Sequence, residues 1–405
     1  MLTTQARHRT PRHLPSSLRA HTMTRVPAEV NDGKCNWLCC GREIFPALLG
    51  AIDAARHSIL LETYIYSPGP LADKFRDALL RARQRGAEVR VMIDALGSMS
   101  LPGSYFDSLR AAGAEARQFN PLRLNRLSIR DHRKLLVCDR QVAFIGGFNI
   151  ATEYEGDGVT CGWCDFGLRL EGQMAEELAR SFNDMFARAD LQHKGFLPLR
   201  QFDARKTITA PREQLLLSGP GRGRNPIKRE LRRDLARARD VQIMVAYFLP
   251  SWRLRRAMVQ VARNGGRVQL LLAGKSDVQL SLLAAQSLYR RFLKTGVEIY
   301  EYQPQILHAK LIIIDDVAYV GSANLDHRSL NLNYELMIRF DDREVAAQAR
   351  ELFHRNLANC RPITWDAWSK SRSLWSRLKQ RWAYFFLARI DPFIARRQWR
   401  QLPDK

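Results

Sequence analysis

The chain has 405 residues, of which 46% are hydrophobic and 26% are charged. This length allows two or three domains, each with its own core, and this composition excludes a mainly disordered protein. Lysine and arginine outnumber aspartate and glutamate by 64 to 41, and the formal net charge of +23 indicates an anionic partner, either nucleic acid or an acidic membrane surface.

Residues 1–36 are expected to form a disordered extension. They are rich in Arg, His, Ser and Thr and contain no acidic residue before Glu29. They lack the apolar stretch of a secretory signal, although the composition would suit a transit peptide, and Met23 is an alternative start. No run of 18 or more apolar residues occurs along the chain, so the sequence predicts no membrane-spanning helix.

Two copies of one pattern follow, in a first half at residues 37–187 and a second at 212–358, joined by a polar linker at 188–211. In the first copy, helical patterns at 45–56 and 72–85 alternate with β-rich runs at 58–66, 87–94 and 112–119. In the second copy, helical patterns at 227–238 and 254–264 alternate with runs at 241–249, 267–273 and 295–302, so that Ser58 aligns with Val241. Strands that alternate with helices predict a layered α/β fold in both halves.

The clearest repeated motif is H-x-K-x4-D. It comprises His132, Lys134 and Asp139 in the first copy and His308, Lys310 and Asp315 in the second. Each motif begins a β-rich run, in which residues i and i+2 point to the same face, so each His and Lys should aim together. An ammonium group beside an imidazole supplies charge and donors suited to a phosphate.

Further residues complete each predicted phosphate site. A Gly-rich turn after each motif ends in Asn149 or Asn324, where backbone and an amide can approach an anion. An imidazole that attacks or donates a proton needs an orienting partner on its other nitrogen. The first copy offers Asp165 for this role and the second offers Glu335, each about 30 residues after its histidine.

Seven cysteines in an odd, widely spaced set indicate a reducing compartment rather than a disulfide framework. Cys161 and Cys164 form a CxxC pair, but no second pair stands at zinc-ribbon distance. We therefore expect ordinary thiols here and no metal or cofactor.

The paired motif resembles the signature of the phospholipase D superfamily. Within it, the strings ILLETYIY at 59–66, AFIGGFN at 143–149 and GSANLD at 321–326 are most similar to bacterial cardiolipin synthases, above all to the shorter B type without amino-terminal membrane spans. The resemblance implies two α/β halves packed face to face around one shared active site.

The resemblance also implies a mechanism without metal. One histidine attacks the phosphorus of a phospholipid to give a phosphohistidine, while the other protonates the leaving alcohol and then deprotonates the incoming one. We assign these roles to His132 and His308, with His132 favoured as the nucleophile. Lys134, Lys310, Asn149 and Asn324 would hold the phosphate, Asp139 and Asp315 would be structural, and Ser322 would add a hydroxyl to the phosphate where the first copy has Gly147.

The expected reaction moves a phosphatidyl group from phosphatidylglycerol or phosphatidylethanolamine onto phosphatidylglycerol. A phospholipase D that uses water as the acceptor is the alternative, and a nuclease is a third, which the net charge would favour. With lipid substrates we expect a peripheral protein on the cytoplasmic face of the bacterial inner membrane and no nucleic-acid partner.

The carboxyl-terminal segment, residues 359–405, is expected to be a basic, Trp-rich membrane-surface tail. From residue 361 onward it contains eleven Lys or Arg against three Asp, and five of the eight tryptophans. Helical spacing places the aromatic and leucine side chains of residues 375, 378, 382, 385 and 386 on one stripe, as in interfacial helices. The alternative is that this stripe packs on the catalytic domain.

Overall fold

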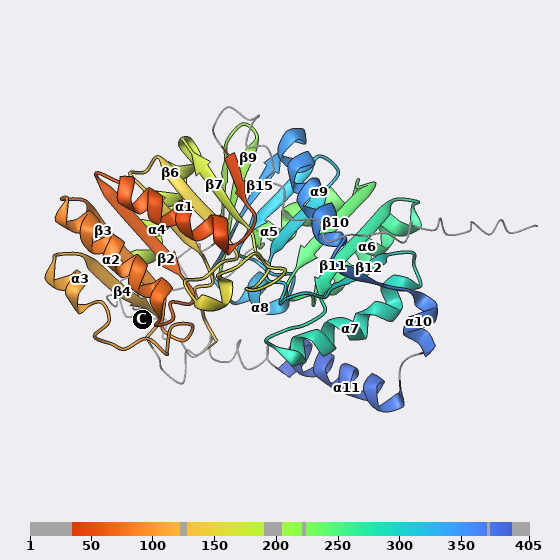
Figure 1. The fold of residues 1–405 in the computed structure, drawn as a ribbon. Coiled ribbons are helices and arrows are strands. Elements are labelled where there is room, and N and C mark those ends of the chain that lie inside the picture. Colours follow the sequence, from red (N-terminus) through yellow and green to blue (C-terminus); the bar gives the residue numbers. More distant parts are fainter. Residues whose placement is uncertain (1–34, 122–127, 190–204, 221–223, 371–372, 391–405) are drawn as a thin grey trace, which may run out of the picture.

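The computed structural model describes residues 35–121, 128–189, 205–220, 224–370 and 373–390. Two β-sheets stand face to face, with helices between them and on their outer faces (Figure 1). The chain folds into two α/β halves, as the sequence predicts. The expected extension falls on residues 1–34, which lie outside the described ranges, and Cys35 already belongs to the first sheet.

The first half contains a seven-stranded sheet in the order β1-β7-β6-β5-β2-β3-β4. β2 and β3 and then β3 and β4 run parallel, whereas β5, β6 and β7 join by antiparallel pairing. The strands are β1 (Cys35–Leu38), β2 (Ser58–Thr63), β3 (Glu88–Asp94), β4 (Glu115–Phe119), β5 (Leu135–Cys138), β6 (Val142–Gly146) and β7 (Gly167–Glu171).

The second half contains a nine-stranded sheet in the order β16-β12-β11-β10-β13-β14-β15-β9-β8. Its seven strands from β12 to β9 repeat the order of the first sheet, and the remaining two extend its edges. The strands are β8 (Lys206–Thr209), β9 (Glu213–Ser218), β10 (Asp240–Val245), β11 (Arg267–Ala273), β12 (Glu298–Tyr302), β13 (Lys310–Ile314), β14 (Val317–Gly321), β15 (Glu335–Asp341) and β16 (Cys360–Ile363).

Beyond the early start of β1, the structure corrects two further predicted boundaries and one alignment. Residues 206–209 of the expected linker pair with β9 as β8, and residues 360–363 of the expected tail pair with β12 as β16. The copies also align one residue earlier than predicted: Asp139 N donates to Ser58 O, and Asp315 N donates to Asp240 O. Five of the six residues of β2 and of β10 are buried, so no alternation of buried and exposed residues could fix this register.

The helices form three layers around the two sheets. α4 (Gln173–Phe186) and α9 (Arg343–Leu357) contribute to one core shared by both halves, together with β5–β7 and β13–β15. α1 (Gly41–Ala54), α2 (Pro70–Gln84) and α3 (Asp107–Ala111) cover the outer face of the first sheet. α5 (Pro226–Leu235), α6 (Trp252–Arg263) and α7 (Gln279–Leu293) cover that of the second.

Burial on both faces explains why the central strands read as continuous apolar runs. All of Leu135–Cys138 and all of Lys310–Ile314 are buried. A sheet with both faces covered favours such runs over alternation. The two motif lysines and histidines at the amino ends of these strands are therefore held by a rigid framework.

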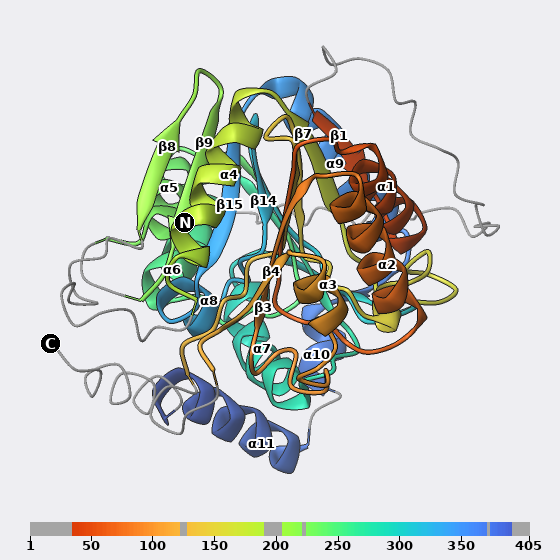
Figure 2. The same cartoon turned by 90° about the vertical axis from the view of Figure 1, so that its left-hand side faces the viewer.

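Three short helices complete the second half. α8 (His327–Asn331) follows β14, and Asp326 caps it by accepting from Ser329 N at 2.8 Å. α10 (Trp365–Lys370) and α11 (Leu374–Phe385) follow β16, and α11 lies along the outer side of α7 in both ribbon views (Figures 1 and 2). No helix within the described ranges is long and apolar enough to cross a membrane.

Candidate active site

The two H-x-K segments meet at the junction of the halves, where each lies beside a strand start of the other half. His132 N donates to Tyr334 O at 3.0 Å, and His308 N donates to Cys164 O at 2.7 Å. The residues after these acceptors are Glu335 and Asp165. The backbone pairing therefore delivers each acid to the histidine of the opposite half.

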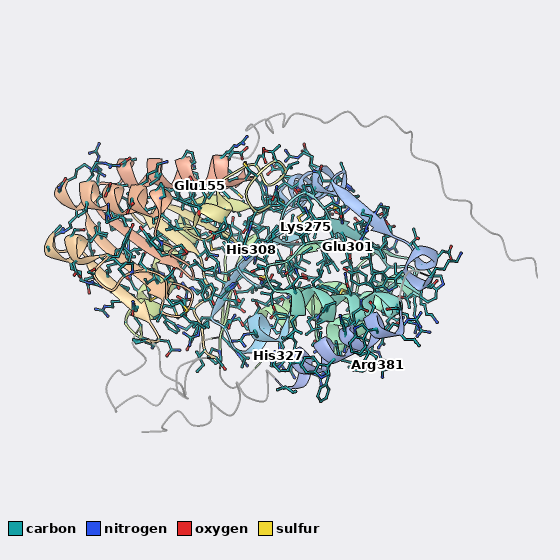
Figure 3. The ribbon with its side chains drawn as sticks, turned by 60° about the horizontal axis from the view of Figure 1, so that its bottom comes forward. Glu155, Lys275, Glu301, His308, His327 and Arg381 are labelled. Carbon is teal, nitrogen blue, oxygen red and sulfur yellow. The ribbon has the colours of Figure 1, made fainter. Side chains whose placement is uncertain are left out.

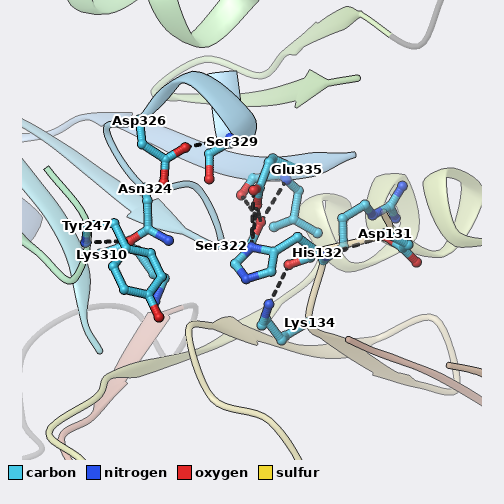
Figure 4. Close-up of polar contacts among 12 residues, drawn as sticks. Asp131, His132, Lys134, Tyr247, Lys310, Ser322, Asn324, Asp326, Ser329 and Glu335 are labelled. Atoms are coloured by element: carbon cyan, nitrogen blue, oxygen red, sulfur yellow. Dashed lines mark hydrogen bonds and ion pairs between the residues drawn. The ribbon is translucent and has the colours of Figure 1, made fainter. Parts of the chain in front are cut away.

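The imidazole–carboxylate pairs accordingly cross between the halves. Nδ1 of His132 lies 3.1 Å from the Glu335 carboxylate (Figure 4). Nδ1 of His308 lies 2.7 Å from Asp165 Oδ2. A buried carboxylate holds the proton on Nδ1 and leaves Nε2 to react. The sequence proposed both acids as orienting residues, and the structure shows that each serves the other copy's histidine.

Both histidines lie in surroundings that favour the neutral ring. Burial, reinforced by the Lys134 and Lys310 ammonium groups, lowers the pKa of His132 well below its usual value. Burial and Lys310 lower the pKa of His308 to about 4. A neutral imidazole has a free lone pair on Nε2, which is what a nucleophile or a general base requires.

The two lysines are almost fully buried at the same place. Lys134 Nζ donates to His132 O at 2.6 Å, and Lys310 Nζ lies 2.9 Å from Nδ1 of His308. Burial lowers the pKa of Lys134 to about 7 and that of Lys310 to about 8, and repulsion from the Lys310 ammonium group adds to the effect on Lys134. An entering phosphate would offset this repulsion, so the site is matched to an anion.

The Gly-rich turns differ between the halves in a way that fits their acids. Ser322 Oγ donates to Glu335 Oε2 at 2.5 Å and accepts from Leu336 N at 3.1 Å, so it supports the acid rather than facing a phosphate (Figure 4). At the equivalent position, a Cβ on Gly147 would lie 2.3 Å from Asp165 Oδ1. Glycine there makes room for the shorter acid to reach His308.

The two asparagines lie on the turns as expected. Among the described residues, the side-chain amide nitrogen of only one of them has no hydrogen-bond partner. Asn324 Oδ1 accepts from Tyr247 N at 3.3 Å, and no described hydrogen bond engages its Nδ2. Asn149 Oδ1 accepts from Ile65 N at 3.1 Å, while its Nδ2 donates to the Tyr154 hydroxyl at 2.7 Å. Asn324 is thus the better placed of the two to donate to a phosphate.

The motif aspartates act at the other end of the strands. Asp139 accepts from the backbone N–H groups of Arg56, His57 and Ser58 at 2.7–2.9 Å. Asp315 accepts from Arg239 N at 3.0 Å and Asp240 N at 2.8 Å. These contacts fix the turns that precede β2 and β10 and involve neither imidazole.

Aromatic side chains that the sequence analysis did not select enclose the imidazoles. The Tyr154 ring packs edge-on to His308 at 5.2 Å between centroids, and Trp163 lies at 5.5 Å. Tyr64 lies 5.0 Å from the His132 ring and beneath Lys134 Nζ. Tyr154 follows Asn149 by five residues and Trp163 precedes Asp165 by two, so closeness to the motif was the available signal.

The cysteines do not form a metal site in the described part of the chain. No group of three or more His, Cys, Asp or Glu side chains there could hold a metal ion. Cys161 is exposed, whereas Cys164 is buried and its Sγ lies 3.3 Å from Asn356 Oδ1.

The comparison with known families matches this geometry. Residues 48–157 and 231–357 match the family described as "Cardiolipin synthase, PLD-like domain". The chain is 32% identical to the major cardiolipin synthase ClsA of Bacillus subtilis over 86% of this chain and 74% of that protein. It is 30% identical to cardiolipin synthase B of Escherichia coli K12 over 89% of this chain and 91% of that protein.

A solved structure supports the fold. The phosphatidylserine synthase of Haemophilus influenzae superposes with a TM-score of 0.71 at 15% identity, covering 90% of this chain and 96% of that one. The family match spans both halves, each with its histidine and lysine, and the relatives are matched over most of their length. The chain therefore belongs to the cardiolipin synthase family of phospholipase D-like phosphatidyltransferases.

Proposed function

We propose that this protein makes cardiolipin by moving a phosphatidyl group from one phospholipid onto the glycerol hydroxyl of phosphatidylglycerol. The observation that carries the proposal is the pair of buried imidazoles, each held at Nδ1 by a carboxylate of the other half. Two buried lysines beside them supply the positive charge that a phosphodiester requires.

The proposed reaction has two displacement steps. In the first, Nε2 of one histidine forms a bond to phosphorus and the phosphorus–oxygen bond to the headgroup breaks. The other histidine, whose protonated form the bound phosphate anion stabilises, donates its proton to the leaving alcohol. In the second, the now neutral imidazole removes the proton from the glycerol hydroxyl of phosphatidylglycerol. The resulting oxygen attacks phosphorus and the phosphorus–nitrogen bond breaks, so the chain ends unchanged.

A difference between the two histidines supports His132 as the nucleophile. The Tyr154 hydroxyl lies 3.4 Å from Nε2 of His308, so that nitrogen already has a hydroxyl partner. The equivalent residue in the second half is Ser329, whose side chain instead lowers the pKa of Glu335. A ring that exchanges protons with hydroxyl groups is suited to the acid–base role, which we assign to His308.

Product analysis tests the proposal. Purified protein is incubated with phosphatidylglycerol alone and with added phosphatidylethanolamine, and the lipids are then separated. We expect cardiolipin together with glycerol or ethanolamine as the leaving alcohol. Phosphatidic acid as the main product would establish the hydrolase instead, and cleavage of DNA without lipid turnover would establish a nuclease.

We also propose that α11 attaches the protein to an anionic membrane, on the cytoplasmic face of the bacterial inner membrane. Its apolar stripe, defined as Leu374, Trp375, Leu378, Trp382 and Phe385, is between 55% and 82% exposed, whereas Gln380 and Ala383 on the opposite face are buried. Apolar side chains so exposed beside Arg and Lys are typical of interfacial helices.

The carboxyl end of α11 lies beside the catalytic region. A cavity of about 140 Å³ is lined jointly by Tyr384 of α11, Trp252 of α6, and Asp326 and His327 at α8. Asp326 lies two residues after the site residue Asn324. A membrane that receives the stripe would therefore lie close to the rim of the site.

Replacing Trp375, Leu378 and Trp382 by serine should release the protein from vesicles that contain phosphatidylglycerol. The three side chains are exposed, so the fold should keep its thermal midpoint, whereas deletion of α11 would uncover the α7 contacts of Gln380 and Ala383. Co-sedimentation with vesicles measures the loss of binding. Comparison of low and high salt measures how far ions screen the attraction between protein and membrane, which acts over about 8–10 Å at ordinary ionic strength. Vesicle binding equal to that of the unchanged protein would contradict the proposal.

A further inference from the structure

A second cavity lies outside the catalytic region, between α7, α10 and α11. Its volume is about 660 Å³. It is lined by side chains of all three helices: Ser287, Arg290, Trp365, Trp368, Ser369, Leu374, Arg377, Leu378, Gln380 and Arg381. None of the residues placed at the phosphate-binding site contributes to it, so it is a separate site.

The charge of this cavity is entirely positive. Arg290 comes from α7, and Arg377 and Arg381 lie one turn apart on α11. No acidic side chain lines the cavity, and no carboxylate of the described residues forms an ion pair with any of the three guanidinium groups. The Arg377 guanidinium donates to Ser369 O at 3.4 Å, which ties it to α10. Arg290, Arg377 and Arg381 are exposed, so three guanidinium groups without a paired carboxylate surround one open cavity and favour an anion there.

A buried amide adds a polar group to the same cavity. Gln380 is 3% exposed and its Nε2 donates to Gln286 Oε1 at 3.1 Å. Its Oε1 is buried and has no hydrogen-bond partner among the described residues. A buried acceptor without a donor is costly, so a hydroxyl of a bound molecule would stabilise it.

The apolar stripe of α11 continues directly from the cavity. Leu374 and Leu378 belong to both, while Trp365 and Trp368 form part of the opposite wall. Arg377 and Arg381 therefore lie along the border between an exposed apolar surface and a basic hollow, and Figure 3 shows Arg381 at the outer edge of the molecule, away from His308. A molecule with a phosphate at one end and hydrocarbon at the other fits this border.

We propose that this cavity, the α7–α11 cavity, binds the phosphate-bearing headgroup of an anionic phospholipid, whose acyl chains follow the stripe into the membrane. The site is non-catalytic and selects anionic bilayers for docking. The inference deepens the proposed membrane attachment and does not depend on phosphatidyl transfer. The segment that follows α11 is an unsuitable occupant, because residues 391–405 carry four Arg or Lys against two Asp.

The test uses the full chain with Arg290, Arg377 and Arg381 replaced by glutamine. The matched control replaces Arg232, Arg237 and Arg263 by glutamine. These residues lie near the carboxyl ends of α5 and α6, at the end of the sheet opposite the active site. Binding to phosphatidylcholine vesicles with and without phosphatidylglycerol is measured at one ionic strength. We expect about 100-fold weaker binding to the anionic vesicles for the cavity variant and little change for the control.

Further arms identify the ligand and separate this inference from the proposed function. Soluble dihexanoyl-phosphatidylglycerol is titrated into each protein below the lipid's critical micelle concentration. The cavity variant should lack one class of binding site that the unchanged protein and the control variant both have. Glycerol 1-phosphate should bind far more weakly than this lipid. The inference would be overturned if the cavity variant and the control variant bound the lipid with the same affinity. It would also be overturned if glycerol 1-phosphate bound with the same affinity as the lipid. Cardiolipin formation in detergent micelles should persist in the cavity variant, because the catalytic residues are untouched.

Discussion

His132→Ala and His308→Ala should each lower the rate of cardiolipin formation by at least about 10²–10⁴-fold. The two rings are the only histidines that the described structure places beside both motif lysines, and each is held by a carboxylate at Nδ1. Removal of either ring takes away the nucleophile or the group that moves the proton. The rate is measured with phosphatidylglycerol in mixed micelles, so that membrane docking does not limit it.

His57→Ala is the matched control. The His57 side chain is exposed, and its backbone N–H binds Asp139 at the far end of β2. This variant should form cardiolipin at the rate of the unsubstituted protein. All three variants should unfold within a few degrees of its thermal midpoint. Near-normal turnover by His132→Ala or His308→Ala would refute the shared-site mechanism.

An activated substrate separates the roles of the two histidines. A phosphatidyl ester of p-nitrophenol needs no general acid, because nitrophenolate leaves without a proton. If His132 attacks phosphorus, His308→Ala should still release a burst of nitrophenolate, whereas His132→Ala should not. The reverse pattern would exchange the two roles and leave the reaction class unchanged.

Asp165→Asn and Glu335→Gln should produce the second largest losses, on the order of 10²–10⁴-fold, because an amide cannot fix the Nδ1–H form of the ring. The structure makes a sharper prediction about which defect each causes. Since Asp165 holds His308, its variant should still release a burst of nitrophenolate from the activated ester, as His308→Ala does. Since Glu335 holds His132, its variant should fail with both substrates.

The pH dependence distinguishes orientation from a merely structural role. Burial raises the pKa of Glu335 to about 7. The carboxylate form is therefore lost as the pH falls through about 7, and activity of the unchanged protein should fall with it. Glu335→Gln should lack this acidic limb of the profile. If instead the variant keeps the profile and shows only a lower thermal midpoint, Glu335 is structural.

The repeat made much of this architecture predictable from the sequence. Two matching series of strands and helices led to two α/β halves, and the duplicated His, Lys, Asn and acid positions led to one composite site. The crossed pairing was not predictable, because His132 and Glu335 are 203 residues apart and the copies alone do not show how they dock. The hydrogen bonds of His132 N to Tyr334 O and of His308 N to Cys164 O decide it.

The sequence also could not predict the direction in which some side chains point. Ser322 lies on the expected turn, yet its hydroxyl turns to Glu335, since a longer acid in the same half needs a donor to hold it. The tail helix was expected from its spacing, but its aromatic stripe could equally have faced the domain. The buried Gln380 and Ala383 show that the opposite face makes that contact.

The two halves share one sequence pattern but hold the opposite histidine with different residues. One half combines a glycine with an aspartate, Gly147 and Asp165, and the other combines a serine with a glutamate, Ser322 and Glu335. Serine in place of Gly147 would collide with Asp165, and glycine in place of Ser322 would remove the hydroxyl that donates to Glu335 Oε2. Divergence at this site must therefore proceed by paired substitutions within one half, and each such step alters the chemistry of the histidine carried by the other. At the centre of the molecule, the acid of each copy is fitted to the histidine of the other.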